Sequence, residues 1–222
     1  MITADNTVAQ LAREHPLSTR TFARYGIDFC CGGGRPLRAV CQERGLDPEA
    51  VVAEVLEDVA DPSADSKRWD QEPSADLIDH ILVAFHEPLR EELPRLEAMC
   101  RKVNRVHHDK APEQLSKLLD CYLALKDELE AHMLKEERVL FPMIKRGHGA
   151  SAREPMACME HEHVRAGSAL KRIRALTSDF VAPEAACNTW RALWSGLEAL
   201  EASLHQHIHL ENNVLFPRAV EG

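Results

Sequence analysis

The sequence of 222 residues has no long apolar run and few aromatic residues, with two tyrosines, three tryptophans and six phenylalanines. No apolar stretch approaches the ~20 residues that a membrane-spanning helix needs. The first segment, MITADNTVAQ, lacks the basic and apolar regions of a secretory signal peptide. These absences predict a cytoplasmic protein with no membrane partner.

An excess of positive charge is also missing, because 27 Lys and Arg stand against 36 Asp and Glu, for a formal net charge of −9. Nucleic acids and anionic membranes are bound through basic patches, so neither is expected as a partner. The seven cysteines have no regular spacing, which favours reduced thiols over a disulfide framework. The twelve histidines, by contrast, are numerous and indicate metal or proton chemistry.

Helical periodicity and turn signals predict an all-α protein in three parts. Residues 1–60 read as a small domain of short helices, and residues 61–75 as a Pro/Ser/Asp-rich linker in which Trp69 is expected to pack against the rest. Residues 76–222 predict an up-down four-helix bundle. Its helices are expected at about 76–104, 113–146, 153–178 and 186–216.

One motif occurs twice, as HMLKEERVLFP at 132–142 and as HIHLENNVLFP at 207–217. In each copy the apolar stripe of the helix continues into a His and a Glu one turn apart, followed by a valine at position 139 or 214. A buried carboxylate costs several kcal/mol unless a positive charge lies beside it, and no Lys or Arg shares either stripe. A metal ion bound by His132, Glu136, His207 and Glu211 would supply that charge.

The other two long helices each place one histidine on the apolar face, His86 and His163. A lone histidine of this kind is commonly a hydrogen-bonded core residue, and for either one alone that interpretation stands. The spacing of 46 residues from His86 to His132 nearly matches the 44 from His163 to His207, which indicates an internal duplication. Four His and two bridging Glu offer eight donor atoms, enough for two metals with positions left for a bridging oxygen and small molecules. A closed, four-coordinate structural zinc fits this count less well.

Several neighbours of these residues have two readings. Glu128 and Glu162 lie close enough to orient a ligand or relay protons, or are solvated charges. His205 and His209 lie on the opposite helix face and are read as surface residues or as supports of the ligands. Pro88, two residues after His86, either breaks its helix or begins a new turn.

With these residues in view, the chain resembles the iron–sulfur cluster repair di-iron proteins, a branch of the hemerythrin-like four-helix bundles. The similarity covers essentially the whole length, through the segments YGIDFCCGGG, HMLKEERVLFPMIK, MEHEHVRAG and HIHLENNVLFPRA. It implies two oxo-bridged, non-haem iron ions, a homodimer, and nitric oxide or oxygen as small-molecule ligands. Damaged iron–sulfur proteins would be the clients. The implied terminal ligands are His86, His132, His163 and His207, and the implied bridging ligands are Glu136 and Glu211.

The loop FCCGGG places Cys30 and Cys31 side by side, where a disulfide between them would be strained. The loop is either a flexible connector or a mobile thiol pair that hands over iron, reacts with nitric oxide or cycles through oxidation.

Three functions of the whole protein are possible: a stress-response protein that binds nitric oxide and donates iron for cluster repair, a carrier or sensor, and a di-iron nitric-oxide reductase. The first is the prediction, since a bare carrier has no use for residues 1–60 and no haem or flavin motif feeds a reductase. Manganese or a mixed metal pair would accept the same ligands.

Overall fold

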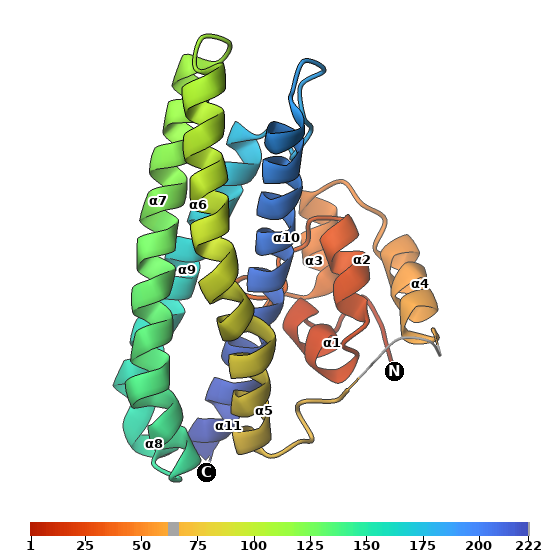
Figure 1. Cartoon of the computed structure of the whole chain (residues 1–222). Helices are drawn as coiled ribbons and strands as arrows, with labels where there is room; N and C mark the ends of the chain where they lie inside the picture. The colour runs from red at the N-terminus through yellow and green to blue at the C-terminus, as the bar shows by residue number, and fades with distance from the viewer. Residues whose placement is uncertain (62–66, 222) are drawn as a thin grey trace.

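The computed structural model describes residues 1–61 and 67–221, and every regular element in these two ranges is a helix. Four long helical rods stand side by side, and a group of short helices packs against the flank formed by α10 (Figure 1). Within the described ranges, no helix is long and apolar enough to cross a membrane. The prediction of an all-α, hemerythrin-like architecture is confirmed.

The short helices at the N-terminus are α1 to α4, each ended or capped by a local signal. The Thr7 hydroxyl accepts a hydrogen bond from the Gln10 backbone amide at the start of α1. The Asp47 carboxylate accepts one from the Glu49 backbone amide at the start of α4. Gly26 and Gly45 follow α2 and α3 with positive φ, which glycine adopts without strain. The four helices are α1 (Val8–Glu14), α2 (Ser18–Arg24), α3 (Leu37–Glu43) and α4 (Pro48–Val59).

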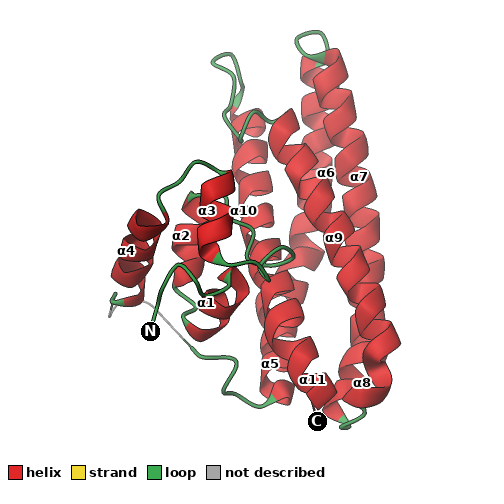
Figure 2. Cartoon of the chain, turned by 180° about the vertical axis from the view of Figure 1, so that it is seen from behind, coloured by secondary structure: helices red, strands yellow, loops and turns green. Residues whose placement is uncertain are grey.

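Each rod of the bundle is built from consecutive helical segments, seen from behind in Figure 2. The first consists of α5 (Ser74–Ile81), η1 (Leu82–His86) and α6 (Glu87–His107), and the second of α7 (Pro112–Lys135), η2 (Glu136–Leu140) and α8 (Phe141–Lys145). The third consists of η3 (Gly149–Ala152) and α9 (Arg153–Leu176), and the fourth of α10 (Asn188–Leu210), η4 (Glu211–Leu215) and α11 (Phe216–Glu221). One half of the bundle is filled by leucines with Tyr122, Trp190 and Trp194, and the other half by residues such as Ile78, Phe141 and Phe216.

Three of the rods are not continuous α-helices, because each contains one wide, π-helical turn: η1, η2 and η4. Each turn closes where a residue just before a proline donates its amide to the carbonyl five residues back: Glu87 to Leu82, Phe141 to Glu136 and Phe216 to Glu211. The next residues, Pro88, Pro142 and Pro217, have no amide, and a proline ring collides with the carbonyl four residues back in a regular helix. The wide turn accommodates the ring. Pro88 therefore begins a new helical segment and does not end the rod.

The wide turn η2 also changes which residues face the core. The expectation that Val139 continues the buried stripe is wrong, since Val139 is 50% exposed and Leu140 is buried in its place. One additional residue in the turn rotates everything after Glu136 relative to a regular helix. In the second copy η4 is equally wide, yet Val214 and Leu215 are both buried, and α1 of the N-terminal helices contacts η4.

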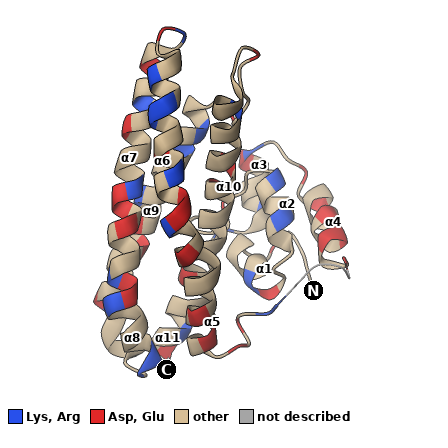
Figure 3. Ribbon diagram, in the orientation of Figure 1, with Lys and Arg blue, Asp and Glu red and all other residues tan. Residues whose placement is uncertain are grey.

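Two further regions are the charged surface of the bundle and the segment before α5. Residues of both charge signs are distributed along α6 and α7, as Figure 3 shows. Residues 62–66 of the expected linker lie outside the described residues. Trp69 packs as expected: its ring stacks on His80 with the centroids 4.2 Å apart.

Candidate metal centre

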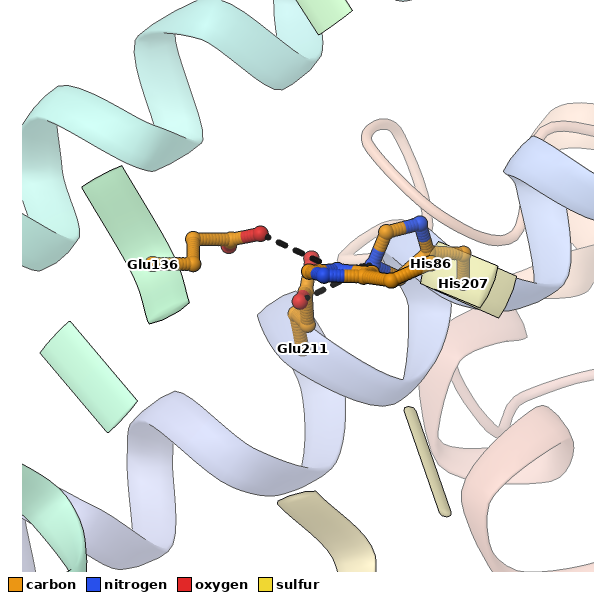
Figure 4. A group of neighbouring side chains, drawn as sticks. All are labelled: His86, Glu136, His207 and Glu211. Carbon is orange, nitrogen blue, oxygen red and sulfur yellow. Dashed lines mark hydrogen bonds and ion pairs between the residues drawn. The ribbon is translucent and has the colours of Figure 1, made fainter. Parts of the chain in front are cut away.

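Six side chains converge inside the bundle, at the level of the three wide turns. They are His86 at the end of η1, His132 on α7, Glu136 at the start of η2, His163 on α9, His207 on α10 and Glu211 at the start of η4. All six are at most 4% exposed. Figure 4 shows Glu136 reaching from one side toward His86, His207 and Glu211. The structure thus brings together every residue that the sequence suggests as a ligand.

Each carboxylate spans two imidazoles, with one oxygen directed at each. Glu136 places Oε2 3.4 Å from His86 Nε2 and Oε1 3.3 Å from His132 Nε2. Glu211 places Oε1 3.0 Å from His207 Nε2 and Oε2 3.1 Å from His163 Nε2. This is the arrangement that two bridging carboxylates need.

The imidazole nitrogens form two facing pairs. His86 and His207 have their Nε2 atoms 3.2 Å apart, and His132 and His163 have theirs 3.1 Å apart. Two nitrogens about 2.1 Å from one ion and at right angles to each other lie about 3.0 Å apart, so each pair is spaced to share an ion. Each pair, with both carboxylates, forms a group of four potential ligand atoms within 4.8 Å of one another.

The buried oxygens provide a test of whether a metal fits here. Both oxygens of Glu136, and Oε2 of Glu211, have no hydrogen-bond partner among the described residues, although all three are fully enclosed. A buried carboxylate without hydrogen bonds or a full counter-charge is strongly destabilising. Cations held between the carboxylates would satisfy these oxygens and the facing nitrogens together. Nitrogen and carboxylate donors suit iron, manganese or zinc.

Three of the four histidines are fixed by a partner at the other ring nitrogen, Nδ1. His86 contacts Glu137 at 2.7 Å, and His163 contacts the Asn212 side-chain oxygen at 2.8 Å. Glu137 and Asn212 each directly follow a bridging Glu, and the sequence analysis missed both. Positions 137 and 212 are equivalent in the two motif copies, and each holds a polar residue directly after a buried Glu. This equivalence is the feature of the sequence that could have identified them.

His132 is fixed in the same way by a residue that the sequence analysis did select. Its Nδ1 lies 2.9 Å from Glu162 Oε2, and Glu162 is also paired with Lys135. This direct contact supports the interpretation of Glu162 as a residue that orients a ligand. A carboxylate at this position sets the tautomer of the imidazole and raises its basicity.

The carboxylates also set the protonation of the centre. Burial acts to lower the pKa of His132, but Glu136, Glu211 and Glu162 outweigh it and raise this pKa to about 9. Burial likewise acts to raise the pKa of Glu211, but His207 and His163 hold it well below its ordinary value. In the absence of metal, protons therefore balance the buried negative charge, and metal binding must displace them.

A small cavity of about 20 Å³ adjoins the centre, lined by His132, His163 and His207 together with apolar side chains such as Leu89 and Leu204. By this measure, one water needs about 10–15 Å³, so the cavity suits a molecule of two atoms. Glu128 also lines it, but this side chain is 42% exposed and pairs with Arg165. Among the described residues, Glu128 forms its ion pair with Arg165, whereas Glu162 contacts the ligand histidine His132.

The double-cysteine loop lies against the same centre. The thiols of Cys30 and Cys31 are 3.7 Å apart and unbonded, and Cys31 Sγ lies 3.8 Å from the backbone oxygen of His163. Asn212 joins the two regions, since its amide donates to the Cys30 carbonyl oxygen at 3.2 Å while its oxygen contacts His163. The Asp28 carboxylate accepts the backbone amides of Cys30, Cys31 and Gly32 and so shapes the turn.

Gly33 serves close packing in this loop. A Cβ added there would lie 2.8 Å from the Phe29 backbone oxygen and 2.9 Å from the Ala9 Cβ. The absence of a side chain at Gly33 therefore lets the loop approach α1 closely. Gly34, in contrast, has open space around its Cα.

The interpretation of His209 as a surface residue is wrong. Its side chain is buried, and its ring packs edge-on against Phe29 with the centroids 5.7 Å apart; His205 packs on the same ring at 6.1 Å. The reason is that the N-terminal helices cover this face of α10, and Ile208 belongs to their core. Burial lowers the pKa of His209 to about 4, which keeps the ring neutral.

Comparisons with known proteins agree with this geometry. The hemerythrin HHE cation-binding domain model matches residues 77–219, and a domain of unknown function, DUF542, matches residues 4–59. The chain is 46% identical over 220 residues to the iron–sulfur cluster repair protein YtfE of Pectobacterium atrosepticum, with 98% of each chain covered. It is 43% identical over 218 residues to YtfE of Dickeya chrysanthemi and 42% identical over 220 residues to YtfE of Escherichia coli, with 98% of each chain covered in both. The cation-binding match and the two buried His/Glu groups together indicate a metal site, and the chain belongs to the YtfE family of iron–sulfur cluster repair proteins.

Proposed function

We propose that this protein holds two iron ions on its six buried ligands, binds nitric oxide beside them and donates iron for the repair of damaged iron–sulfur clusters. One observation carries the proposal: Glu136 and Glu211 each direct one oxygen at each of the two imidazole pairs. A core that needed only one ion, or only packing, has no use for two carboxylates that span both pairs. When bound, iron would supply a redox-active Lewis acid to small ligands.

The adjoining cavity supports nitric oxide as the ligand. Its volume of about 20 Å³ admits a diatomic molecule, and its apolar lining favours a neutral one. His132, His163 and His207 form the wall nearest to the ligand set, so a bound molecule would lie next to the centre.

The position of Cys31 supports the transfer of iron through the loop. Its thiol contacts the backbone of His163, itself a member of one ligand group, and Cys30 lies directly beside it. In this proposal the thiols receive the ion that leaves the imidazole pair and pass it to a client protein. Asn212 holds the loop in register with His163 during this transfer.

The test compares iron loading and iron transfer in the full-length protein. The Cys30→Ala/Cys31→Ala variant is expected to bind as much iron as the wild type, because neither thiol belongs to the ligand groups. It is expected to lose activity in cells and to transfer iron to an apo-ferredoxin slowly. Iron content halved in this variant would contradict the assigned role, as would transfer at the wild-type rate.

Nitric oxide is tested on the reduced, iron-loaded protein under anaerobic conditions. A stable nitrosyl spectrum at stoichiometric nitric oxide is the expected result. Sustained release of nitrous oxide over many turnovers would replace the binding function with a reductase activity.

A further inference from the structure

His207 differs from the other three histidines of the centre in how its ring is held. Its Nδ1 is buried and has no hydrogen-bond partner among the described residues, whereas His86, His132 and His163 each have one at this atom. Histidines that bind metals almost always need such a partner to fix the orientation of the ring. Among the described residues, the ring of His207 is therefore held by packing and not by a hydrogen bond at Nδ1.

The ring of Phe85 lies directly against His207. The two planes are 10° apart and their centroids are 5.2 Å apart, which is a stacked arrangement. Phe85 is in turn held by His80, which meets it edge-on at 5.7 Å, and His80 is stacked on Trp69 at 4.2 Å. A column of three rings thus runs from the segment before α5 to a ligand of the centre.

The internal duplication indicates why a phenylalanine stands there. Phe85 directly precedes His86, just as Glu162 directly precedes His163 in the other half of the bundle. Glu162 reaches across to His132 and bonds its Nδ1. Phe85 reaches across to His207, the counterpart of His132 in the second motif copy, and covers the face of its ring.

We propose that Phe85 is a positioning residue for the metal centre, which orients His207 by ring stacking where its counterpart Glu162 orients His132 by a hydrogen bond. This inference rests on the proposed pair of metal positions. It predicts that the position bound by His86 and His207 depends on an aromatic ring at residue 85, and that the position bound by His132 and His163 does not.

The experiment titrates metal-free, full-length protein with Co²⁺ and follows both binding steps by the visible absorption of the bound ion. In Phe85→Leu, the affinity of one ion is expected to fall by about tenfold or more, with a changed spectrum for that ion, and the other ion is expected to bind as before. Phe85→Tyr keeps the ring and is expected to restore wild-type binding. The thermal midpoint of each metal-free variant reports any loss of packing alone.

Phe216→Leu is the matched control. The Phe216 ring is stacked on His163 at 6.1 Å and 8°, but His163 also has Asn212 at its Nδ1, so its orientation does not depend on the ring. Both ions are expected to bind this variant nearly as they bind the wild type. Equal affinities in Phe85→Leu and wild type would overturn the inference, as would a parallel loss of both ions in Phe85→Leu. A wild type that binds only one Co²⁺ would instead refute the proposed pair of positions.

Discussion

At the scale of residues, the centre is defined by buried charge that the fold does not neutralise by itself. Glu136 and Glu211 are fully enclosed, and among the described residues they are faced by imidazoles and not by Lys or Arg. Such carboxylates cost several kcal/mol unless a cation or protons accompany them. The ligand set could be predicted from the sequence because this cost makes a glutamate on an apolar stripe conspicuous. Asn212 and Glu137 were missed, because a polar residue beside a single ligand motif looks the same whether it contacts solvent or a ring nitrogen, and only a comparison of the two motif copies points to them.

The raised pKa of His132 predicts that, as the pH rises, the stability of the metal-free protein falls while its metal affinity increases. This pKa is about 9 in the metal-free fold, against an ordinary value of 6.5. The stability from this proton is fully present below about pH 6.5 and is lost as the pH rises through 9. Metal binding needs the neutral ring, so the metal affinity is expected to rise over the same range.

Thermal unfolding of the metal-free protein and Mn²⁺ titrations, both at pH 6.5 and 9.5, measure these two trends. His132→Gln is the control, because the difference between this variant and the wild type isolates the proton on His132 from the titration of cysteines. A metal-free wild type that gains stability relative to His132→Gln on going to pH 9.5 would contradict the assignment.

At the scale of elements, the wide turns set the register of the rods next to the ligands, and the double-cysteine loop lies against the centre. The sequence patterns locate the four rods, but a regular helix period places Val139 in the core, where the structure has Leu140. The wide turn η2 before Pro142 shifts the register after Glu136, because it holds one additional residue, whereas Val214 stays buried beside the equally wide η4. The contact between His209 and Phe29 was likewise beyond prediction, because it depends on how the N-terminal helices dock on α10.

The loop gives a matched pair of glycine substitutions. Gly33→Ala places a Cβ against the backbone oxygen of Phe29, and the unfolding free energy is expected to fall by about 1–3 kcal/mol. Repair activity in cells should fall as well, because Cys31 shifts relative to His163. Gly34→Ala adds its Cβ to open space and should change little. Urea denaturation of both variants is the measurement, and coincident curves would show that Gly33 has no packing role.

At the scale of the whole molecule, the metal centre links all four rods of the bundle with the N-terminal helices. Its ligands come from every rod, and Asn212 and Asn213 donate to the Cys30 carbonyl oxygen of the double-cysteine loop. A bound ion therefore stabilises contacts between segments that are far apart in the sequence. The repeated motif and its spacing made the meeting of the four rods predictable, but not the contact with the double-cysteine loop.

Removal of the metal should lower the stability of the whole chain. At a free metal concentration about a hundred times Kd, each bound ion adds about 2.7 kcal/mol, which for a chain of this size corresponds to a fall in Tm of about 5–10 °C for each ion lost on chelation. Calorimetry with and without a chelator measures the difference. The Glu136→Gln/Glu211→Gln variant is the control and should show almost no response to the chelator. An equal Tm for loaded and chelated wild type would contradict a metal that joins the four rods.

The most direct measurement of the central claim is the number of iron ions per chain after anaerobic reconstitution, in wild type, Glu136→Gln and Glu128→Gln. The two ligand groups that share Glu136 and Glu211 predict two ions in the wild type. Glu136→Gln is expected to hold at most one, whereas Glu128→Gln should keep both because Glu128 pairs with Arg165 at the surface. One ion or none in the wild type, or two retained in Glu136→Gln, would contradict a pair of iron ions bridged by these carboxylates.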